Sequence, residues 1–326
     1  MKTVLVTGGA GFIGSNFIHY MLERYDYKII NLDLLTYAGN LKNLEGIENH
    51  PNYTFVHGDI RDRALLEQLF REYEIDTVIN FAAESHVDRS IDEPEVFLRT
   101  NIMGTQALLD TAKRHWNVEP DNRYSRDYKE GTKFIQISTD EVYGTLGEKG
   151  LFTEETPLAP NSPYSASKTS ADLIVRAYYE TYGMPVNITR CSNNYGPYQH
   201  IEKLIPLVIT NCMQDKKVPV YGDGMQIRDW LYVADHCSAI DTVLHKGTLG
   251  EVYNIGGNNE KTNIEIVKLI INSLGKTEEL IGHVADRPGH DRRYAIDNTK
   301  ITTEFGWKPK YTFEEGIEKT IDWYME

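Results

Sequence analysis

The chain has 326 residues, of which 40% are hydrophobic and 25% charged, and its formal net charge is -14. These proportions are typical of a globular protein with a substantial core. The acidic balance argues against nucleic acid as a partner, because a phosphate backbone is bound mainly by clustered lysine and arginine.

The three cysteines, Cys191, Cys212 and Cys237, are too few and too scattered for a disulfide framework or a structural zinc site. The first residues lead directly into a strand-like run and a glycine cluster, without the longer apolar stretch of a signal peptide. No segment approaches the roughly 18 to 20 apolar residues that span a bilayer. We therefore expect a cytoplasmic protein with no metal site and no membrane contact.

Short apolar runs alternate with helix-like stretches through the first part of the chain, which predicts a parallel sheet with helices on both faces. The expected strands are 4–6, 28–32, 53–57, 77–81, 133–138 and 186–190. A helix between the first two strands has Ile13, Phe17 and Met21 on one face, and longer helices are expected at 97–115 and 165–182. The polar segment 117–132 is expected to be a surface insertion.

After residue 195 the alternation weakens and glycine-containing loops dominate, with short helices expected at 263–274 and 313–324. The predicted fold class is therefore α/β, with a doubly wound parallel sheet of the Rossmann type in residues 1–190. Residues 191–326 are expected to form a smaller, loop-rich C-terminal part that closes over the mouth of the sheet, with some chain crossing between the two.

Three glycines, Gly8, Gly11 and Gly14, directly follow the first strand and open the first helix. In this context they allow a tight turn, a close approach of backbone to a pyrophosphate and close packing of helix on strand. Asp33 ends the second strand, where a carboxylate accepts hydrogen bonds from a ribose and repels the 2′-phosphate of NADP. The pattern predicts NAD as cofactor, and Asp59, after the third strand, is expected to face the adenine.

Tyr164 and Lys168 are spaced one helical turn apart, so both side chains lie on one face of their helix. Tyrosine ionises near pH ~10, and a neighbouring ammonium together with an oxidised nicotinamide would lower that pKa. The phenol could then accept a hydroxyl proton as hydride leaves for NAD. The expected cofactor-binding residues are Gly8, Gly11, Phe12, Ile13, Gly14, Asp33, Asp59, Ile60, Ala82, Ser85, Tyr164 and Lys168.

With Thr139 at the end of the preceding strand, these motifs resemble the extended short-chain dehydrogenase/reductase family over essentially the whole chain. The run 139–144 narrows the match, since it resembles the motif of nucleotide-sugar 4,6-dehydratases. The resemblance implies that Asp140 protonates the departing C6 hydroxyl and that Glu141 removes the C5 proton. Two close carboxyls tend to separate in pKa, which suits an acid and a base. The expected catalytic residues are Thr139, Asp140, Glu141, Tyr164 and Lys168.

The substrate side carries further likenesses to the same family. Segment 82–90 resembles the stretch that approaches the nicotinamide and the sugar, and 193–197, 203–204, 228–229 and 286–291 resemble the nucleotide-sugar clamp. Arginine and lysine in these segments suit a diphosphate. The expected substrate-binding residues are Ser85, His86, Asn193, Lys203, Leu204, Arg228, Asn263, Arg287 and His290.

The resemblance implies oxidation of a nucleotide sugar at C4 by NAD, loss of water across C5–C6 and return of hydride to C6. It favours dTDP-glucose over UDP- or CDP-glucose, and a homodimer packed through the helices at 97–115 and 165–182. Residues 1–190 would bind NAD and carry the catalytic groups, and residues 191–326 would mainly bind the nucleotide sugar. Two alternatives stay open: an epimerase or decarboxylase on the same scaffold, and a non-catalytic NAD-binding regulator.

Overall fold

The computed structural model describes residues 2–286 and 290–326. A large sheet of seven parallel strands has the spatial order β10-β6-β5-β4-β1-β2-β3. Its strands are β1 (Thr3–Thr7), β2 (Lys28–Asp33), β3 (Tyr53–His57), β4 (Thr77–Asn80), β5 (Lys133–Thr139), β6 (Val186–Cys191) and β10 (Val252–Ile255). This architecture confirms the predicted doubly wound parallel sheet.

Both faces of the large sheet are covered by helices, so its strands are apolar on both sides. In β1, Val4 and Val6 pack into the core under α1 (Phe12–Arg24) and α8 (Val233–Lys246), whereas Leu5 points to the other core. That second core lies under α2 (Arg63–Tyr73), α5 (Thr105–Trp116) and α6 (Pro163–Tyr182). The continuous apolar runs of the sequence thus follow from burial on two faces.

Strand β1 lies between β2 and β4, and the chain fills the sheet outward from it in two directions. Ligands of such sheets bind in the crevice outside the carboxyl ends of the strands, at this switch point. The loops after β1, β2 and β4 therefore meet where the sequence places its glycines and Asp33. The fold positions the site before any side chain is considered.

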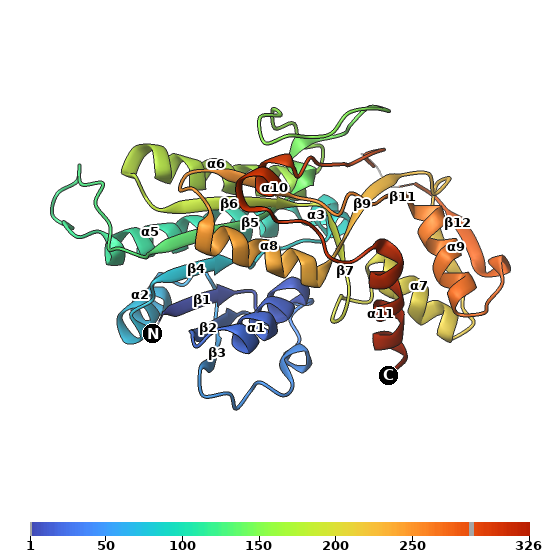
Figure 1. Ribbon diagram of the computed structural model, residues 1–326, viewed down its shortest axis with the longest axis horizontal. Helices are drawn as coiled ribbons and strands as arrows, with labels where there is room; N and C mark the ends of the chain where they lie inside the picture. Colours follow the sequence, from blue (N-terminus) through green and yellow to red (C-terminus); the bar gives the residue numbers. More distant parts are fainter. Residues whose placement is uncertain (1, 287–289) are drawn as a thin grey trace.

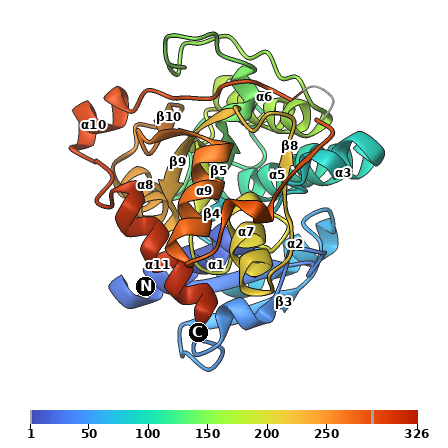
Figure 2. The ribbon, with the colours of Figure 1, turned by 90° about the vertical axis from the view of Figure 1, so that its right-hand side faces the viewer.

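The C-terminal part stands at one end of the large sheet, and Figure 2 views it from that side. It has a three-stranded sheet of β7 (Asn193–Tyr195), β9 (Ile227–Tyr232) and β11 (Glu260–Thr262), and a pair of β8 (Val218–Tyr221) and β12 (Ile281–Val284). The helices α7 (Leu204–Met213), α9 (Asn263–Ser273) and α11 (Phe313–Met325) cover these strands. Its apolar core is separate from the two cores of the large sheet.

The chain returns to the large sheet after leaving it. Helix α8 and strand β10 follow β7 and β9 in the sequence. Even so, β10 pairs with β6, and α8 packs against α1. Helix α10 (Thr299–Phe305) then covers β10. The boundary expected near residue 190 is therefore a point where the chain first leaves the sheet, and the later residues complete it.

The helix expected at 97–115 is divided into parts of different pitch. Helix α4 (Pro94–Phe97) leads into a π-helical turn, Leu98–Gly104, which continues as α5. Buried Asn101 in that turn accepts a hydrogen bond from the Glu84 amide (2.8 Å) and donates one to the Glu84 carbonyl (3.0 Å). The wide turn therefore holds the loop after β4, and π-turns of this kind are frequent at functional sites.

The remaining short helices are α3 (Val87–Asp92) and the 3-10 turns Leu41–Leu44, Asp140–Tyr143 and Glu278–Leu280. Segment 117–132 forms no helix or strand and is largely exposed, as expected of a surface insertion. Within residues 2–286 and 290–326, none of the helices combines the length and the apolar character needed to cross a membrane.

Candidate active site

A cavity of about 320 Å³ opens at the carboxyl ends of the large sheet. All the residues expected to bind the cofactor line it, together with the whole expected catalytic group. The members from the cofactor set are Gly8, Gly11, Phe12, Ile13, Gly14, Asp33, Asp59, Ile60, Ala82, Ser85, Tyr164 and Lys168. Residues far apart in sequence are thus brought to one crevice.

The glycine turn fits a diphosphate because it leaves no room for side chains. Gly8 has a φ of 69°, and a Cβ on it would lie 2.7 Å from the Ala82 nitrogen. A Cβ on Gly14 would lie 2.4 Å from the Gly8 oxygen. The backbone of the turn is therefore bare at the N-terminus of α1, where amide groups and the helix dipole attract an anion.

Asp33 is fixed in place for a ribose. Its Oδ2 accepts a hydrogen bond from the Ala10 amide (2.9 Å) and its Oδ1 accepts one from the Leu35 amide (2.7 Å). Burial raises the pKa of Asp33, and these two bonds oppose that rise. A carboxylate held at the end of β2 matches the position that reads the ribose hydroxyls in dinucleotide folds.

Asp59 lines the same cavity but is engaged by a neighbour. Arg61 Nη2 lies 2.5 Å from Asp59 Oδ2. Burial acts to raise the pKa of Asp59, but hydrogen bonds from Arg61 outweigh it and hold that pKa below its usual range. Asp59 is thus an anion with a fixed partner at the edge of the crevice, and its contact with the adenine stays a prediction.

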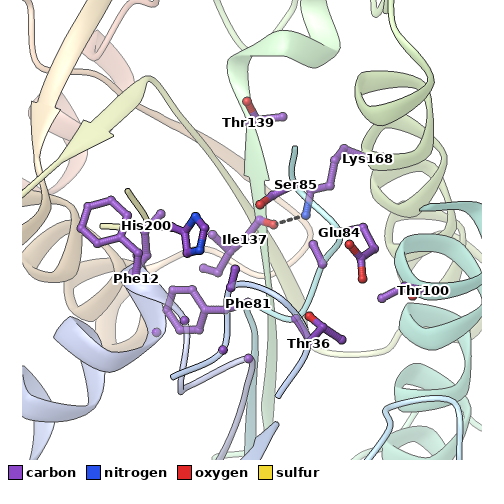
Figure 3. A pocket seen from close by; sticks show the side chains of 18 of the residues that line it. Phe12, Thr36, Phe81, Glu84, Ser85, Thr100, Ile137, Thr139, Lys168 and His200 are labelled. Carbon is purple, nitrogen blue, oxygen red and sulfur yellow. Dashed lines mark hydrogen bonds between the residues drawn. The ribbon is translucent and has the colours of Figure 1, made fainter. Parts of the chain in front are cut away.

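Tyr164 and Lys168 project from the first turns of α6, which begins with a capping box at Ser162 and a proline at its first position. Lys168 Nζ donates a hydrogen bond to the Ile137 carbonyl on β5 (2.7 Å), as Figure 3 shows. Thr139, at the end of the same strand, is hydrogen-bonded to Tyr164. The helix and the strand therefore bring the three predicted groups together.

The protein groups around Tyr164 oppose its ionisation. Burial raises the pKa of Tyr164 well above its ordinary value, and the charges of Glu141, Cys191 and Asp140 add to the rise. The sequence predicts that the ammonium of Lys168 together with an oxidised nicotinamide lowers this pKa, and that combined effect stays a prediction for the chain with NAD bound.

Asp140 and Glu141 open the 3-10 turn after β5, which Thr139 caps by accepting a hydrogen bond from the Glu141 amide (3.3 Å). Asp140 is 1% exposed, whereas Glu141 is only half-buried. Burial raises the pKa of Asp140 well above its usual range, and the charges of Glu141 and Asp229 reinforce the rise. A carboxyl whose surroundings favour its protonated form therefore lies next to a more exposed carboxyl, which suits one as acid and the other as base.

Three of the expected substrate-binding residues, Ser85, Asn193 and Lys203, line the cavity. Lys203 Nζ also donates a hydrogen bond to the Ser85 carbonyl (3.2 Å), which joins the C-terminal part to the loop after β4. His86 does not line the cavity itself, but its Nδ1 lies 3.2 Å from Oε1 of Glu202, which does. The cavity thus has a cation and an amide at the side where the two parts of the chain meet.

The other expected substrate-binding residues do not line that cavity. Arg228 is buried, lies over the Tyr294 ring (4.3 Å to its centroid) and donates a hydrogen bond to the Asp291 carbonyl (2.9 Å). Leu204 and Asn263 are the first residues of α7 and α9. His290 Nδ1 lies 2.6 Å from Asp286 Oδ1. Arg287 lies outside the described residues.

Several cavity residues were not expected from the sequence. The loop 36–39 follows Asp33 at the end of β2, and it could have been found by the rule that such loops line the crevice. Cys191 and His200 also line the cavity. Cys191 ends β6, so the same rule on strand ends could have found it. Nothing in the sequence context of His200 marks it, since its place depends on how the C-terminal part packs on the sheet.

The same crevice can be compared with known proteins. Residues 5–320 match the family model described as GDP-mannose 4,6 dehydratase. The chain belongs to this family. The resemblance to nucleotide-sugar 4,6-dehydratases is thereby confirmed. No group of histidine, cysteine, aspartate and glutamate side chains that could hold a metal ion occurs in the described part of this family member.

Several relatives with high sequence identity to this chain are named dTDP-glucose 4,6-dehydratase. A dTDP-glucose 4,6-dehydratase of Xanthomonas campestris pv. campestris (strain B100) is 56% identical, with 100% of this chain and 93% of the relative covered. A dTDP-glucose 4,6-dehydratase of Bacillus anthracis str. Ames, solved in complex with NAD, is 57% identical with a TM-score of 0.90 and covers 100% and 97%. One of Streptomyces venezuelae, solved with NAD and TYD bound, is 47% identical with a TM-score of 0.91 and covers 99% and 97%.

Proposed function

We propose that this chain is a hydro-lyase with dTDP-glucose 4,6-dehydratase activity and NAD as its cofactor. The observation that carries the proposal is the acid pair: buried Asp140 lies beside Glu141 in the same cavity as Tyr164 and Lys168. The glycine turn and Asp33 fit NAD, and the relatives at 47–57% identity with that name support the substrate.

Each step assigns a proton to a named group. NAD, when bound, supplies a positive charge next to Tyr164 and takes up and later returns the hydride. Tyr164 accepts the proton of the C4 hydroxyl, with Thr139 hydrogen-bonded to its oxygen and Lys168 holding positive charge nearby. The resulting C4 ketone acidifies C5, so Glu141 removes the C5 proton while Asp140 protonates the C6 hydroxyl, which departs as water. With hydride returned to C6 and a proton returned to C5, the product is the 4-keto-6-deoxy sugar, still attached to its nucleotide.

An epimerase or decarboxylase on this scaffold would need Tyr164 and Lys168 but would have no water to expel. It would therefore have no use for a protonated carboxyl at position 140. The elevated pKa of Asp140 favours dehydration over these alternatives. The non-catalytic regulator is disfavoured because it would need neither the acid pair nor the tyrosine.

The test follows the isotope content of the product. Purified protein is incubated in deuterated water with dTDP-, UDP- or CDP-glucose, and the mass of the nucleotide-sugar product is measured by mass spectrometry. We expect loss of one water and gain of one deuteron, fastest with dTDP-glucose. In Glu141→Gln elimination should fall by about 10²- to 10⁴-fold, whereas Glu148→Gln, at an exposed glutamate in the following loop, should retain it. A native rate in Glu141→Gln would refute the assignment of the base.

A homodimer belongs to the same proposal. Exposed apolar side chains gather on the adjoining helices α3 to α6, and they are Ile91, Val96, Leu98, Met103 and Leu173. An apolar face of this kind marks an interface. Sedimentation velocity should give a dimer for the native chain and a monomer after Met103→Glu with Leu173→Glu, and a native monomer would contradict the assignment. The cytoplasmic location stays a prediction, supported by three buried free cysteines.

A further inference from the structure

Helix α6 carries a third polar residue in line with the two already described. Tyr164, Lys168 and Asp172 follow one another at intervals of four, so they share one face of the helix. Lys168 is 4% exposed and Asp172 is 1% exposed. A buried carboxylate thus lies one helical turn beyond a buried ammonium, on the side away from the cavity.

Two neighbouring strands hold these side chains. Lys168 Nζ donates to the Ile137 carbonyl on β5 (2.7 Å), and Arg190 Nε on β6 donates to Asp172 Oδ2 (2.9 Å). Ser138, the residue after Ile137, pairs with Arg190 in the sheet. Adjacent turns of α6 are therefore attached to adjacent strands, which fixes both side chains against rotation.

Arg190 is anchored in turn from its far side. Its Nη1 donates a hydrogen bond to the Tyr143 hydroxyl (3.0 Å), and that hydroxyl donates one to Asn254 Oδ1 (2.8 Å). Asp172 Oδ1, by contrast, is buried and has no hydrogen-bond partner among the described residues. One oxygen of Asp172 thus forms the ion pair with Arg190, and the other adds negative charge to the layer that contains Lys168.

Among the acidic groups around Lys168, Asp172 contributes most to keeping the ammonium charged. Burial lowers the pKa of Lys168, and Asp172 followed by Cys191 raises it. Burial also raises the pKa of the Cys191 thiol to about 12, so that thiol is neutral near pH ~7. The remaining titratable groups facing this layer are Tyr164 on α6, Arg190 on β6, and Asp140 and Glu141 in the turn after β5.

We propose that Asp172 is a positioning residue for the oxidation step, which acts through Lys168 by holding the ammonium group charged and in place beside Tyr164. The assignment of that step rests on the proposed function. Removing the carboxylate leaves a buried amine with no anion to offset its desolvation, so the amine gives up its proton at lower pH. The neutral amine then no longer favours the phenolate of Tyr164.

The first measurement needs no substrate. Lysine labelled with ¹³C at Cε is incorporated, and the Lys168 signal is identified as the one missing from Lys168→Met. We expect its titration midpoint to fall by roughly one pH unit in Asp172→Asn, the size of effect that one nearby opposite charge exerts. In Asp172→Glu, which restores the charge, it should return close to the native midpoint. An unchanged midpoint in Asp172→Asn would overturn the proposal.

A purely structural role for Asp172, as the partner of Arg190, predicts a different pattern. In that case Arg190→Gln would lower the Lys168 midpoint as Asp172→Asn does. We expect Arg190→Gln to leave it unchanged or raise it, because Asp172 then keeps its charge. Since an unpaired buried charge destabilises the fold, the double variant Asp172→Asn with Arg190→Gln removes both charges and should still show the lower midpoint.

The second measurement is the pH profile of kcat/KM with dTDP-glucose. We expect its alkaline limb to move to lower pH in Asp172→Asn by about the shift seen for Lys168, and to recover in Asp172→Glu. Coincident profiles for the native chain and Asp172→Asn would overturn the link to oxidation. A native chain with the expected Lys168 titration but no conversion of dTDP-glucose would support the charge assignment and contradict the proposed function alone.

Discussion

Gly14, at the start of α1, has no room for a side chain. A Cβ there would lie 2.4 Å from the Gly8 oxygen and 2.8 Å from the Gly9 Cα, well inside the ordinary contact distance of about 3.5–4.0 Å. The helix must therefore move by about 1 Å away from the turn. Overpacking costs about 1–3 kcal/mol, and the better helix propensity of alanine offsets up to about 1 kcal/mol of it. We expect Gly14→Ala to lower the free energy of unfolding by about 1–2 kcal/mol.

Thermal unfolding with and without NAD measures both consequences. For a chain of this length 1 kcal/mol corresponds to about 1.5 °C in Tm, so we expect a fall of about 2–3 °C. NAD at a hundred times its Kd stabilises the native chain by about 2.7 kcal/mol, and this rise in Tm should largely disappear in Gly14→Ala. Gly147→Ala is the control, because no atom lies within 4 Å of its Cβ. A Gly14→Ala variant whose Tm values with and without NAD match those of Gly147→Ala would refute the role of the glycine turn in binding NAD.

Two further predictions concern residues outside the crevice. His245 Nδ1 lies 2.8 Å from Asp241 Oδ1, and that hydrogen bond raises the pKa of His245. Its stabilisation is therefore complete below the unfolded pKa of about 6.5 and is lost as pH rises through the folded value. His245→Gln should lower Tm at pH ~6, with a loss in the free energy of unfolding of about 1 kcal/mol or less for a half-exposed pair. An equal loss of stability at pH ~6 and pH ~9 would argue against the pair. Trp116 is 1% exposed and its Nε1 donates to the Ile75 carbonyl (2.7 Å). Trp116→Phe should cost about 2–3 kcal/mol in urea unfolding, and a loss below about 0.5 kcal/mol would show that the site repacks or that water replaces the bond.

The six strands expected in the first part of the chain all exist, with ends that differ by at most one residue. They were readable because a parallel strand buried on both faces is a continuous apolar run. Strand β10 was missed because it is a run of only four residues, Val252–Ile255, in a loop-rich region, although α8 precedes it as helices precede other strands of the sheet. Its place in the sheet is set by pairing with β6, which sequence periodicity does not report.

The candidate site likewise contains residues that could be placed from the sequence and residues that could not. The cofactor and catalytic residues could be placed because each follows a strand or opens a helix, and those ends meet at one edge of the sheet. The substrate residues depend on how the C-terminal part packs on the sheet, since Arg228 lies on β9 and Leu204 and Asn263 open α7 and α9, and the sequence does not report that packing. His86 turns to Glu202, and Arg228 is buried against Tyr294. The burial that opposes ionisation of Tyr164 was not visible in the motif.

The return of the chain to the large sheet has a consequence for its synthesis. Strand β6 has β5 on one side, and its other edge is covered only when β10 has been made. A ribosome that has passed Cys191 but not reached Val252 therefore carries a sheet with an open edge of unpaired backbone N–H and C=O groups. Unpaired edges of this kind recruit strands from other chains. We therefore expect chaperones to retain nascent chains that stall between β7 and β10. Strand β10, made late in synthesis, protects the edge of β6, which is made earlier.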